Sequence, residues 1–294
     1  MFRKFLIFCV ILALAGCSGQ NSKKSGTDLL IDGYALDGKV ISIDNSLFSV
    51  PSPHQIAKIL AEENISYDNQ ILNPAGNIRN YTNSFKKALN LGVYGADLGY
   101  INQYGNTQDA ITYFSIIKGL SQQLDLINAI KKETFNRIEK NIYDQDSLIT
   151  LLSNSFQEID LFLKSNSQEH IGVLILTGGW VESMYILSKF AMRYKNNQEL
   201  TMRLCENKKA LSNLIKIISH FAEKNKIYET LIELLIELEN TFDYIEIKYI
   251  YEYTETLTEE KITKVYTKTK IEASDEVILR IAEIIEKIRN FVIL

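Results

Sequence analysis

The last three quarters of the chain contain no proline. The 294 residues include three prolines, Pro51, Pro53 and Pro74. None of the 220 residues after Pro74 is therefore a helix-breaking proline. Proline costs about 3 kcal/mol inside a helix, because it lacks the N–H donor and clashes with the preceding turn. This long proline-free stretch favours an all-helical body.

Apolar residues recur at helical spacing almost without interruption from Tyr81 onward. An earlier helix opens at Ser52-Pro53, where serine can cap and proline can take the first helical position. Short connections join antiparallel neighbours. The predicted fold is therefore predominantly all-α, a set of stacked antiparallel helical hairpins. The expected helices cover about 81–103, 108–123, 129–141, 146–164, 168–195, 197–222 with a break near 206, and 226–242.

After Tyr244 the apolar period changes from helical to alternating, and about 245–271 reads as a β-hairpin rich in Tyr, Thr and Val. Ser274-Asp275-Glu276 then opens a final helix. Because an isolated hairpin is marginally stable in water, we expect this one to lie on the helices. Two interpretations stay open. The hairpin could offer an edge to a partner strand, or it could be a purely structural element whose lysines and glutamates prevent aggregation.

The first residues form a targeting signal. Arg3 and Lys4 precede an apolar run at 5–14, which is too short to span a membrane as a stop-transfer helix, and Leu14-Ala15-Gly16-Cys17 closes it. This tetrapeptide resembles the bacterial lipobox, in which the cysteine is acylated and the chain is cut before it. By that resemblance Cys17 carries diacylglycerol and acyl chains such as palmitate, which anchor the protein to a membrane. An uncleaved anchor or an ordinary signal peptide is the alternative.

The predicted organisation has three parts. Residues 1–16 form the signal peptide, 17–28 the lipidated cysteine and a flexible polar tether, and 29–294 a single helical domain whose lead-in at 29–50 is extended. Surface-exported lipoproteins of the Bacteroidota often resemble one another in an acidic cluster after the cysteine, whereas this chain has Lys23 and Lys24. We therefore expect a cell-envelope protein on the outer membrane, facing the periplasm.

Familiar catalytic and binding patterns are missing from the sequence. A net charge of −4 argues against a nucleic-acid binder. His54, His170 and His220 stand apart without an H-E-x-x-H motif or a cysteine pair, which argues against a zinc site. No G-x-S-x-G elbow or Walker loop occurs. We expect no metal, no cofactor and no enzymatic activity.

Cysteine usage adds no chemistry. Cys9 lies in the predicted signal peptide and Cys17 is the predicted site of lipid attachment. Cys205 therefore remains alone and cannot form an intramolecular disulfide. Its place in a helical pattern is typical of a small buried hydrophobic residue.

Two glycine-bearing helices stand out as a candidate site. Gly92, Gly95 and Gly99 are spaced by three and four, which places them on one helix face, and they do not match a dinucleotide-binding loop. The second segment, 171–186, contains Gly178 and Gly179, and its apolar run ends at Glu182, which favours a central buried helix over a membrane span.

We expect the two glycine faces to pack together. Asp97 or Glu182 would then be held at the crossing by tyrosine hydroxyls or an arginine, because a buried carboxylate must be paired or have a raised pKa. Two interpretations stay open: carboxylates that fix the helix register, or a binding or catalytic role. The candidate residues of this buried polar or binding site are Tyr94, Asp97, Tyr100, Trp180 and Glu182.

Several motifs together resemble a family of uncharacterised helical lipoproteins of the Bacteroidota. The likeness covers nearly the whole mature chain and implies a helical fold and an envelope address, but no activity or catalytic residues. The motifs are Pro51-Ser52-Pro53, Leu72-Asn73-Pro74, the 88–100 stretch, Gly178-Gly179-Trp180-Val181-Glu182, the hairpin and the final helix.

Three functions are compatible with the sequence. A lipid-anchored, non-enzymatic scaffold or adaptor with an envelope protein partner is favoured, because the specific sequence features concern helix packing and cellular localisation. A binder of a small molecule or peptide, using a pocket near the glycine-rich helices, is the alternative. An enzyme with an unfamiliar site around Asp97 and Glu182 is the third.

Overall fold

The structure, a computed structural model, describes residues 30–31, 34–35, 39–43, 46–50, 53–222, 226–257 and 262–294. Side chains are described from His54 onward, except for several in the hairpin. The predicted signal peptide, Cys17 and the tether lie outside the described residues, so lipidation stays a prediction.

The fold is predominantly all-α, as the sequence predicts, and the C-terminal β-hairpin and final helix are confirmed. The helix expected over 197–222 divides after Glu206, near the expected break. The described residues form α1 Pro53–Glu62, α2 Ser84–Gln103, α3 Thr107–Gln123, α4 Lys132–Lys140, α5 Gln145–Ser165, α6 Glu169–Arg193, α7 Gln198–Glu206, α8 Lys208–Ala222, α9 Ile227–Phe242 and α10 Asp275–Ile293, with 3₁₀ turns at Asn69–Ile71, Ala75–Asn80 and Leu126–Asn128.

Three antiparallel strand pairs accompany the helices. β1 Leu30–Ile31 pairs with β2 Tyr34–Ala35, β3 Lys39–Ile43 with β4 Ser46–Val50, and β5 Glu246–Leu257 with β6 Ile262–Glu272. The first two pairs lie in the segment expected to be extended.

Side-chain caps fix where several helices begin. An Asn, Asp or Ser side chain accepts a hydrogen bond from a backbone N–H of the first turn, which would otherwise lack a partner. These caps are Asn83 for α2, Asn106 for α3, Asp144 for α5, Asn197 for α7 and Ser274 for α10.

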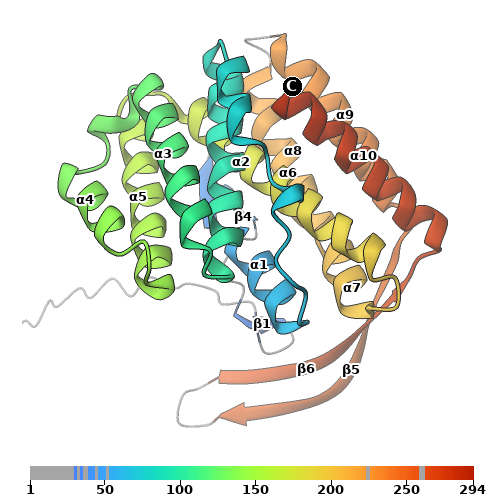
Figure 1. The fold of residues 1–294 in the computed structure, drawn as a ribbon. Coiled ribbons are helices and arrows are strands. Elements are labelled where there is room, and N and C mark those ends of the chain that lie inside the picture. Colours follow the sequence, from blue (N-terminus) through green and yellow to red (C-terminus); the bar gives the residue numbers. More distant parts are fainter. Residues whose placement is uncertain are drawn as a thin grey trace, which may run out of the picture.

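Helix α6 is the centre of the helical body. In Figure 1 the helices run from α4 and α5 at one side, through α3, α2 and α6, to α9 and α10 at the other. α6 contacts α1, α2, α5, α7, α8 and α10. Within the described residues it is the one helix long and apolar enough to cross a membrane, but 83% of its most apolar window is buried by the fold. We therefore describe α6 as a core helix, in agreement with the sequence.

Helices α2 and α6 touch backbone to backbone where their glycines meet. A Cβ added to Gly92 would lie 1.9 Å from the Ile175 carbonyl oxygen, and one added to Gly178 would lie 1.8 Å from the Leu89 carbonyl oxygen. The Gly179 backbone nitrogen lies at the same crossing, 2.7 Å from the Gly92 Cβ position. Only glycine permits an approach this close.

The other two glycines of α2 do not face α6, so the expectation that all three share this contact is wrong. Gly95 faces the Phe156 ring of α5, and Gly99 faces the start of α1 at His54. A spacing of seven residues covers nearly two turns, and α2 is surrounded by several helices. Its glycine stripe is therefore divided among three neighbours.

The β5–β6 hairpin extends beyond the helices instead of lying on them, so that expectation is also wrong (Figure 1). Among the side chains that the structure describes, those at the base of the hairpin pack on the core, namely Ile245, Ile271 and Ala273. Farther along, the Tyr251 and Tyr253 side chains are 61% and 53% exposed. The alternation in the sequence indicates a strand, but it does not tell whether one face is covered.

The close crossing predicts opposite effects for two glycine substitutions in α2. Gly92→Ala should lower the free energy of unfolding by about 3 kcal/mol or more, because the new methyl would meet backbone that cannot move aside. Gly99→Ala, whose Cβ would have an ordinary contact at 3.9 Å, should stabilise the protein by up to about 1 kcal/mol. Urea unfolding followed by circular dichroism measures both. Equal effects of the two variants would contradict the geometry.

Candidate functional site

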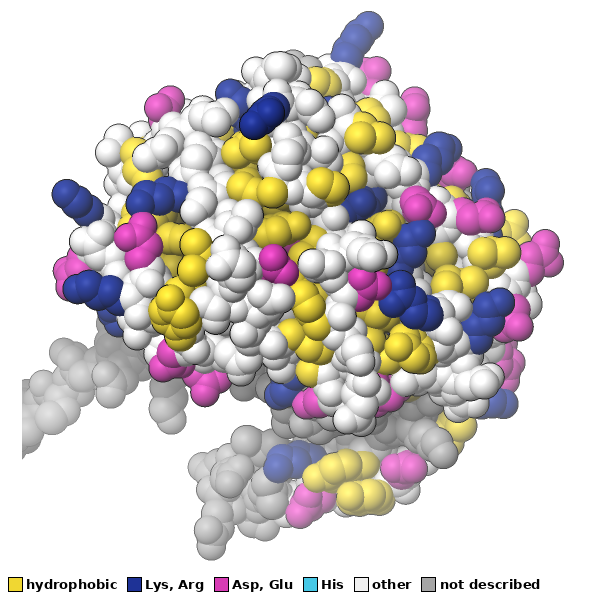
Figure 2. Space-filling model, viewed as in Figure 1, with side chains coloured by type: hydrophobic (Ala, Val, Ile, Leu, Met, Phe, Trp, Pro, Cys, Tyr) yellow, Lys and Arg dark blue, Asp and Glu magenta, His cyan; other side chains and the backbone are white. Residues whose placement is uncertain are grey.

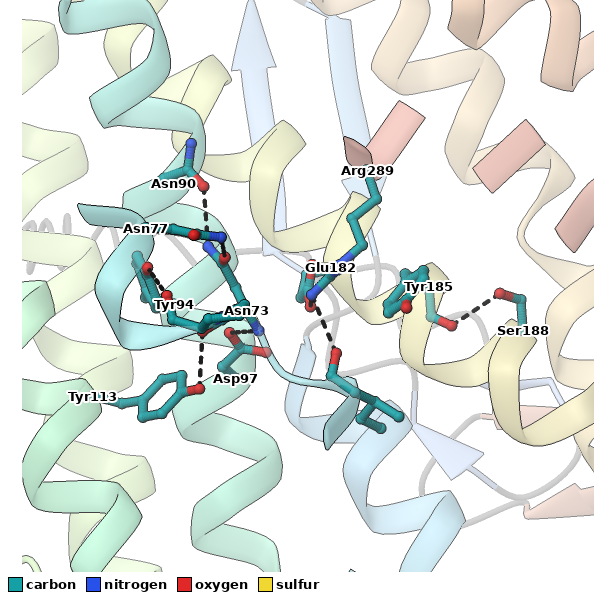
Figure 3. Close-up of polar contacts among 12 residues, drawn as sticks. Asn73, Asn77, Asn90, Tyr94, Asp97, Tyr113, Glu182, Tyr185, Ser188 and Arg289 are labelled. Carbon is teal, nitrogen blue, oxygen red and sulfur yellow. Dashed lines mark hydrogen bonds and ion pairs between the residues drawn. The ribbon is translucent and has the colours of Figure 1, made fainter. Parts of the chain in front are cut away.

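Asp97 of α2 and Glu182 of α6 are completely buried beside the glycine crossing. Asp97 follows Gly92 by five residues, and Glu182 follows Gly178 by four, so each carboxyl lies about one helical turn beyond the contact. In Figure 3 the Asp97 side chain, from α2, and the Glu182 side chain, from α6, extend into the same part of the core. The close approach of the two backbones therefore brings two acids together in the interior.

Arg289 of α10 neutralises Glu182. Its Nε and Nη2 atoms donate to the two carboxylate oxygens, each at 2.8 Å, which is the strong two-pronged geometry of an arginine–carboxylate pair. Arg289 Nη2 also donates to the Ile71 carbonyl at 3.1 Å, and the guanidinium carbon lies 4.0 Å from the Tyr185 ring centre. A pair this deeply buried is expensive to break, because the remaining charge would have no partner.

Asp97 shares its surroundings with Glu182 and lacks a cation of its own. The Asn73 N–H donates to Asp97 Oδ2 at 3.2 Å, whereas Oδ1 receives no hydrogen bond from any described residue. Burial and the neighbouring Glu182 charge raise the pKa of Asp97 well above its ordinary value, although Arg289 opposes this. Protonation makes Asp97 neutral, which removes the repulsion between its charge and the charge of Glu182.

The raised pKa of Asp97 favours its neutral, protonated form, and the Arg289 guanidinium balances the charge of Glu182. This arrangement avoids the large free-energy cost of an unpaired charge in the core.

The cluster is joined to the loop from Leu72 to Pro74, in which Leu72 and Asn73 are buried and the polar groups are bonded to side chains from the helices (Figure 3). Tyr113 of α3 donates to the Asn73 carbonyl at 2.9 Å, and Tyr94 of α2 donates to the Pro74 carbonyl at 2.9 Å. The Asn73 side chain donates to Tyr81 and to Asn90. A buried loop is stable only when its backbone groups are satisfied in this way.

The candidate residues named from the sequence therefore do not form one site. Asp97 and Glu182 meet, and Tyr94 bonds to the adjoining loop. Tyr100 belongs to another group, where its hydroxyl accepts from the Asp68 N–H at 2.9 Å and its ring stacks on Tyr67. Trp180 is buried, and its indole N–H has no hydrogen-bond partner in the described part of the chain.

Sequence reasoning missed Asn73, Tyr113 and Arg289. Asn73 stands out in the sequence only within the Leu72-Asn73-Pro74 motif, and no local pattern shows that its N–H meets an acid 24 residues away. Arg289 left a weak signal: it stands four residues after Ile285 and four before Ile293, on the buried face of α10. A charged residue at such a position predicts a buried partner.

The arrangement has little capacity for chemistry on a substrate. Asp97 and Glu182 are both 0% exposed, and a catalytic acid or base must come within hydrogen-bonding reach of the reacting group. Burial raises the pKa of the Cys205 thiol to about 12, so it is not a ready nucleophile. His170 and His220 both lie against the Phe221 ring, and no metal-binding group of three ligands is found among the described residues.

A surface cavity of about 420 Å³ lies elsewhere, between α3 and α4. Its lining mixes aromatic, aliphatic and polar side chains, and includes the Lys118–Glu139 ion pair at 2.7 Å. Neither carboxyl of the buried cluster lines it. The lining residues are Ile111, Phe114, Ser115, Lys118, Gly119, Gln122, Glu139, Ile142 and Tyr143.

Comparison with known proteins identifies no relative: no protein-family model, no curated protein and no solved structure matches the chain. The resemblance to helical lipoproteins thus rests on the sequence motifs alone.

The buried acid predicts a pH dependence of stability with a defined sign. The folded-state pKa of Asp97 lies above its unfolded value, so the wild-type protein loses stability as the pH rises from about 4 toward that pKa. Asp97→Asn mimics the protonated acid and does not titrate. Its stability relative to wild type should therefore increase with pH, by up to about 1.4 kcal/mol per unit. Urea unfolding at pH 4.5, 5.5 and 7 measures this trend.

Asp68→Asn is the matched control with the opposite sign. The hydrogen bond from Arg193 holds the pKa of Asp68 below its ordinary value, so the wild-type carboxylate stabilises the fold above the unfolded pKa. This variant should lose stability relative to wild type as the pH rises. A flat or falling trend for Asp97→Asn would show that Asp97 is ionised in the folded protein.

Proposed function

We propose that this protein is a lipid-anchored, non-enzymatic scaffold or adaptor of the bacterial cell envelope. The observation that supports the non-enzymatic part most strongly is the complete burial of Asp97 and Glu182 beside the backbone-tight crossing of α2 and α6. The residues best suited to acid–base chemistry face the interior. Their hydrogen bonds and ion pairs go to Arg289 and to the loop at Asn73.

The proposed anchor rests on the N-terminal sequence. A short basic region, an apolar run and Leu14-Ala15-Gly16-Cys17 together match what lipoprotein processing requires. Acyl chains on Cys17 would hold the protein at the membrane, and the polar residues that follow would form a tether to the helical body. The lysines after the cysteine, together with the resemblance to Bacteroidota lipoproteins, favour the outer membrane and the periplasmic side.

The binding of a small molecule or a peptide is a second candidate function, favoured by the cavity between α3 and α4. Phe114 and Tyr143 supply aromatic surface there, and Gln122 supplies hydrogen-bonding groups. This cavity is not the one expected near the glycine-rich helices, so a binder would use different residues from those first considered.

Lipidation can be tested with the full-length chain expressed in its native envelope. We expect labelled palmitate to be incorporated into the wild-type protein and mass spectrometry to find Cys17 as its modified first residue. Cys17→Ser should lose the label and leave the membrane fraction. A labelled Cys17→Ser variant, or an unlabelled wild-type protein, would contradict the proposed anchor.

The scaffold function can be tested by affinity purification from gently solubilised envelopes, with mass spectrometry of proteins and released small molecules. We expect a stoichiometric protein partner that is retained by Asp97→Asn and is absent from an untagged control. A small molecule released instead, and lost in Tyr143→Ala, would support the second candidate function and contradict the scaffold.

A further inference from the structure

Over most of the β5–β6 hairpin, the side chains that the structure describes are exposed to solvent. Its longer strand has 12 residues and spans about 40 Å. Beyond its base, Ile250, Tyr253 and Val265 are 48%, 53% and 57% exposed. Figure 2 shows its side chains beneath the helical body, where apolar, basic and acidic groups are all visible. Two strands alone are marginally stable in water, so a hairpin of this length gains from a further strand.

One face of the hairpin is charged, and its groups contact one another. Lys248 forms ion pairs with Glu246 and Glu272, at 3.3 and 3.0 Å. Tyr266 stacks on Tyr253 and donates to Glu255 at 2.9 Å. These contacts join side chains of both strands across this face.

The opposite face carries hydroxyls and apolar groups in its described positions. The Tyr251 and Thr254 hydroxyls lie 2.9 Å apart, and the Thr256 and Thr263 hydroxyls lie 3.4 Å apart. Val265 is paired with Thr254 in the register. An added strand could extend this face without burying a charge.

Strand β5 offers the accessible edge. The hairpin is a two-stranded sheet in the described part of the chain, so each strand has one edge without a partner strand there. In Figure 1 β6 runs on the side of the helices and β5 forms the outer margin. An outer edge presents backbone N–H and C=O groups that a further strand can bond.

A β-bulge at Glu252 limits how β5 can pair with itself. The register shifts between Tyr251 and Tyr253, so Lys248 and Ile250 share a face with Tyr253 and Glu255. Two antiparallel β5 strands can therefore match faces when Lys248 of one copy lies opposite Glu255 of the other. Ile250 then lies opposite Tyr253.

This register is also the one that charge favours. The two-fold symmetry produces two Lys248–Glu255 contacts, and opposite charges across a strand pair are stabilising. A shift of two residues in one direction would place Glu246 opposite Glu255, and like charges in this position are destabilising. A shift in the other direction would place Ile250 opposite Glu255.

We propose that a second copy of this chain pairs antiparallel along β5, centred on the bulge, so that two hairpins form one four-stranded sheet. The proposal does not depend on the lipid anchor or on the scaffold function. Edge pairing buries less surface than a standard protein interface, so the dimer should be weak and concentration-dependent in detergent. Attachment of both copies to one membrane would raise their effective concentration.

Charge reversal tests the register in the full-length protein, purified in dodecyl maltoside and analysed by sedimentation velocity over a range of concentrations. Glu255→Lys or Lys248→Glu alone should raise the dimer dissociation constant roughly tenfold, because each creates two like-charge contacts. The double variant Lys248→Glu with Glu255→Lys should restore dimerisation. Lys270→Glu, on the same face but on β6, is the control and should leave the dimer intact.

Disulfide trapping gives a second readout that does not depend on stability. Mixing Ile250→Cys protein with Tyr253→Cys protein should give a mixed disulfide, because side chains directly opposite in a strand pair are close enough to bond. Val265→Cys, on β6 and the other face, should not cross-link. A wild-type protein that stays monomeric at every concentration, or a dimer unaffected by the charge reversals, would overturn the proposal. An extended segment of another protein would then be the occupant to seek.

Discussion

The Arg289 guanidinium holds together three parts of the chain that are far apart in sequence. It binds Glu182 of α6 with two hydrogen bonds, donates to the Ile71 carbonyl, and itself belongs to the last helix. α6 is the core helix, so this contact fixes α10 against the centre of the fold. It also fixes the loop that leads into α2, and the loop in turn donates to Asp97.

The buried charges and the glycine crossing depend on each other. Gly92 and Gly178 let two backbones touch, which leaves no room for water or a ligand at this point. The acids one turn away are therefore enclosed by the same contact, and they must be neutralised inside the protein. Arg289 pairs with Glu182 and the raised pKa of Asp97 favours its neutral form, so the polar cluster specifies how α2, α6 and α10 meet.

Much of the fold could be predicted because its signals are local. The absence of proline and the helical period predict the helices, and the alternating pattern predicts the hairpin. The glycine spacing and the acids beside it predict a buried crossing, because glycine and aspartate are unfavourable in a helix interior without a tertiary reason. The partners could not be predicted in the same way. Asn73 and Arg289 lie 24 and 192 residues from Asp97, and only the folded chain brings them there.

The account requires that Glu182 and Arg289 act as one unit, and a double-mutant cycle measures this most directly. Arg289→Met in the wild-type background should lower the free energy of unfolding by about 3 to 5 kcal/mol, because it leaves a buried carboxylate unpaired. The same substitution in a Glu182→Gln background should cost much less, which gives a coupling energy of at least about 2 kcal/mol. Additive effects, with no coupling between the two residues, would contradict the account.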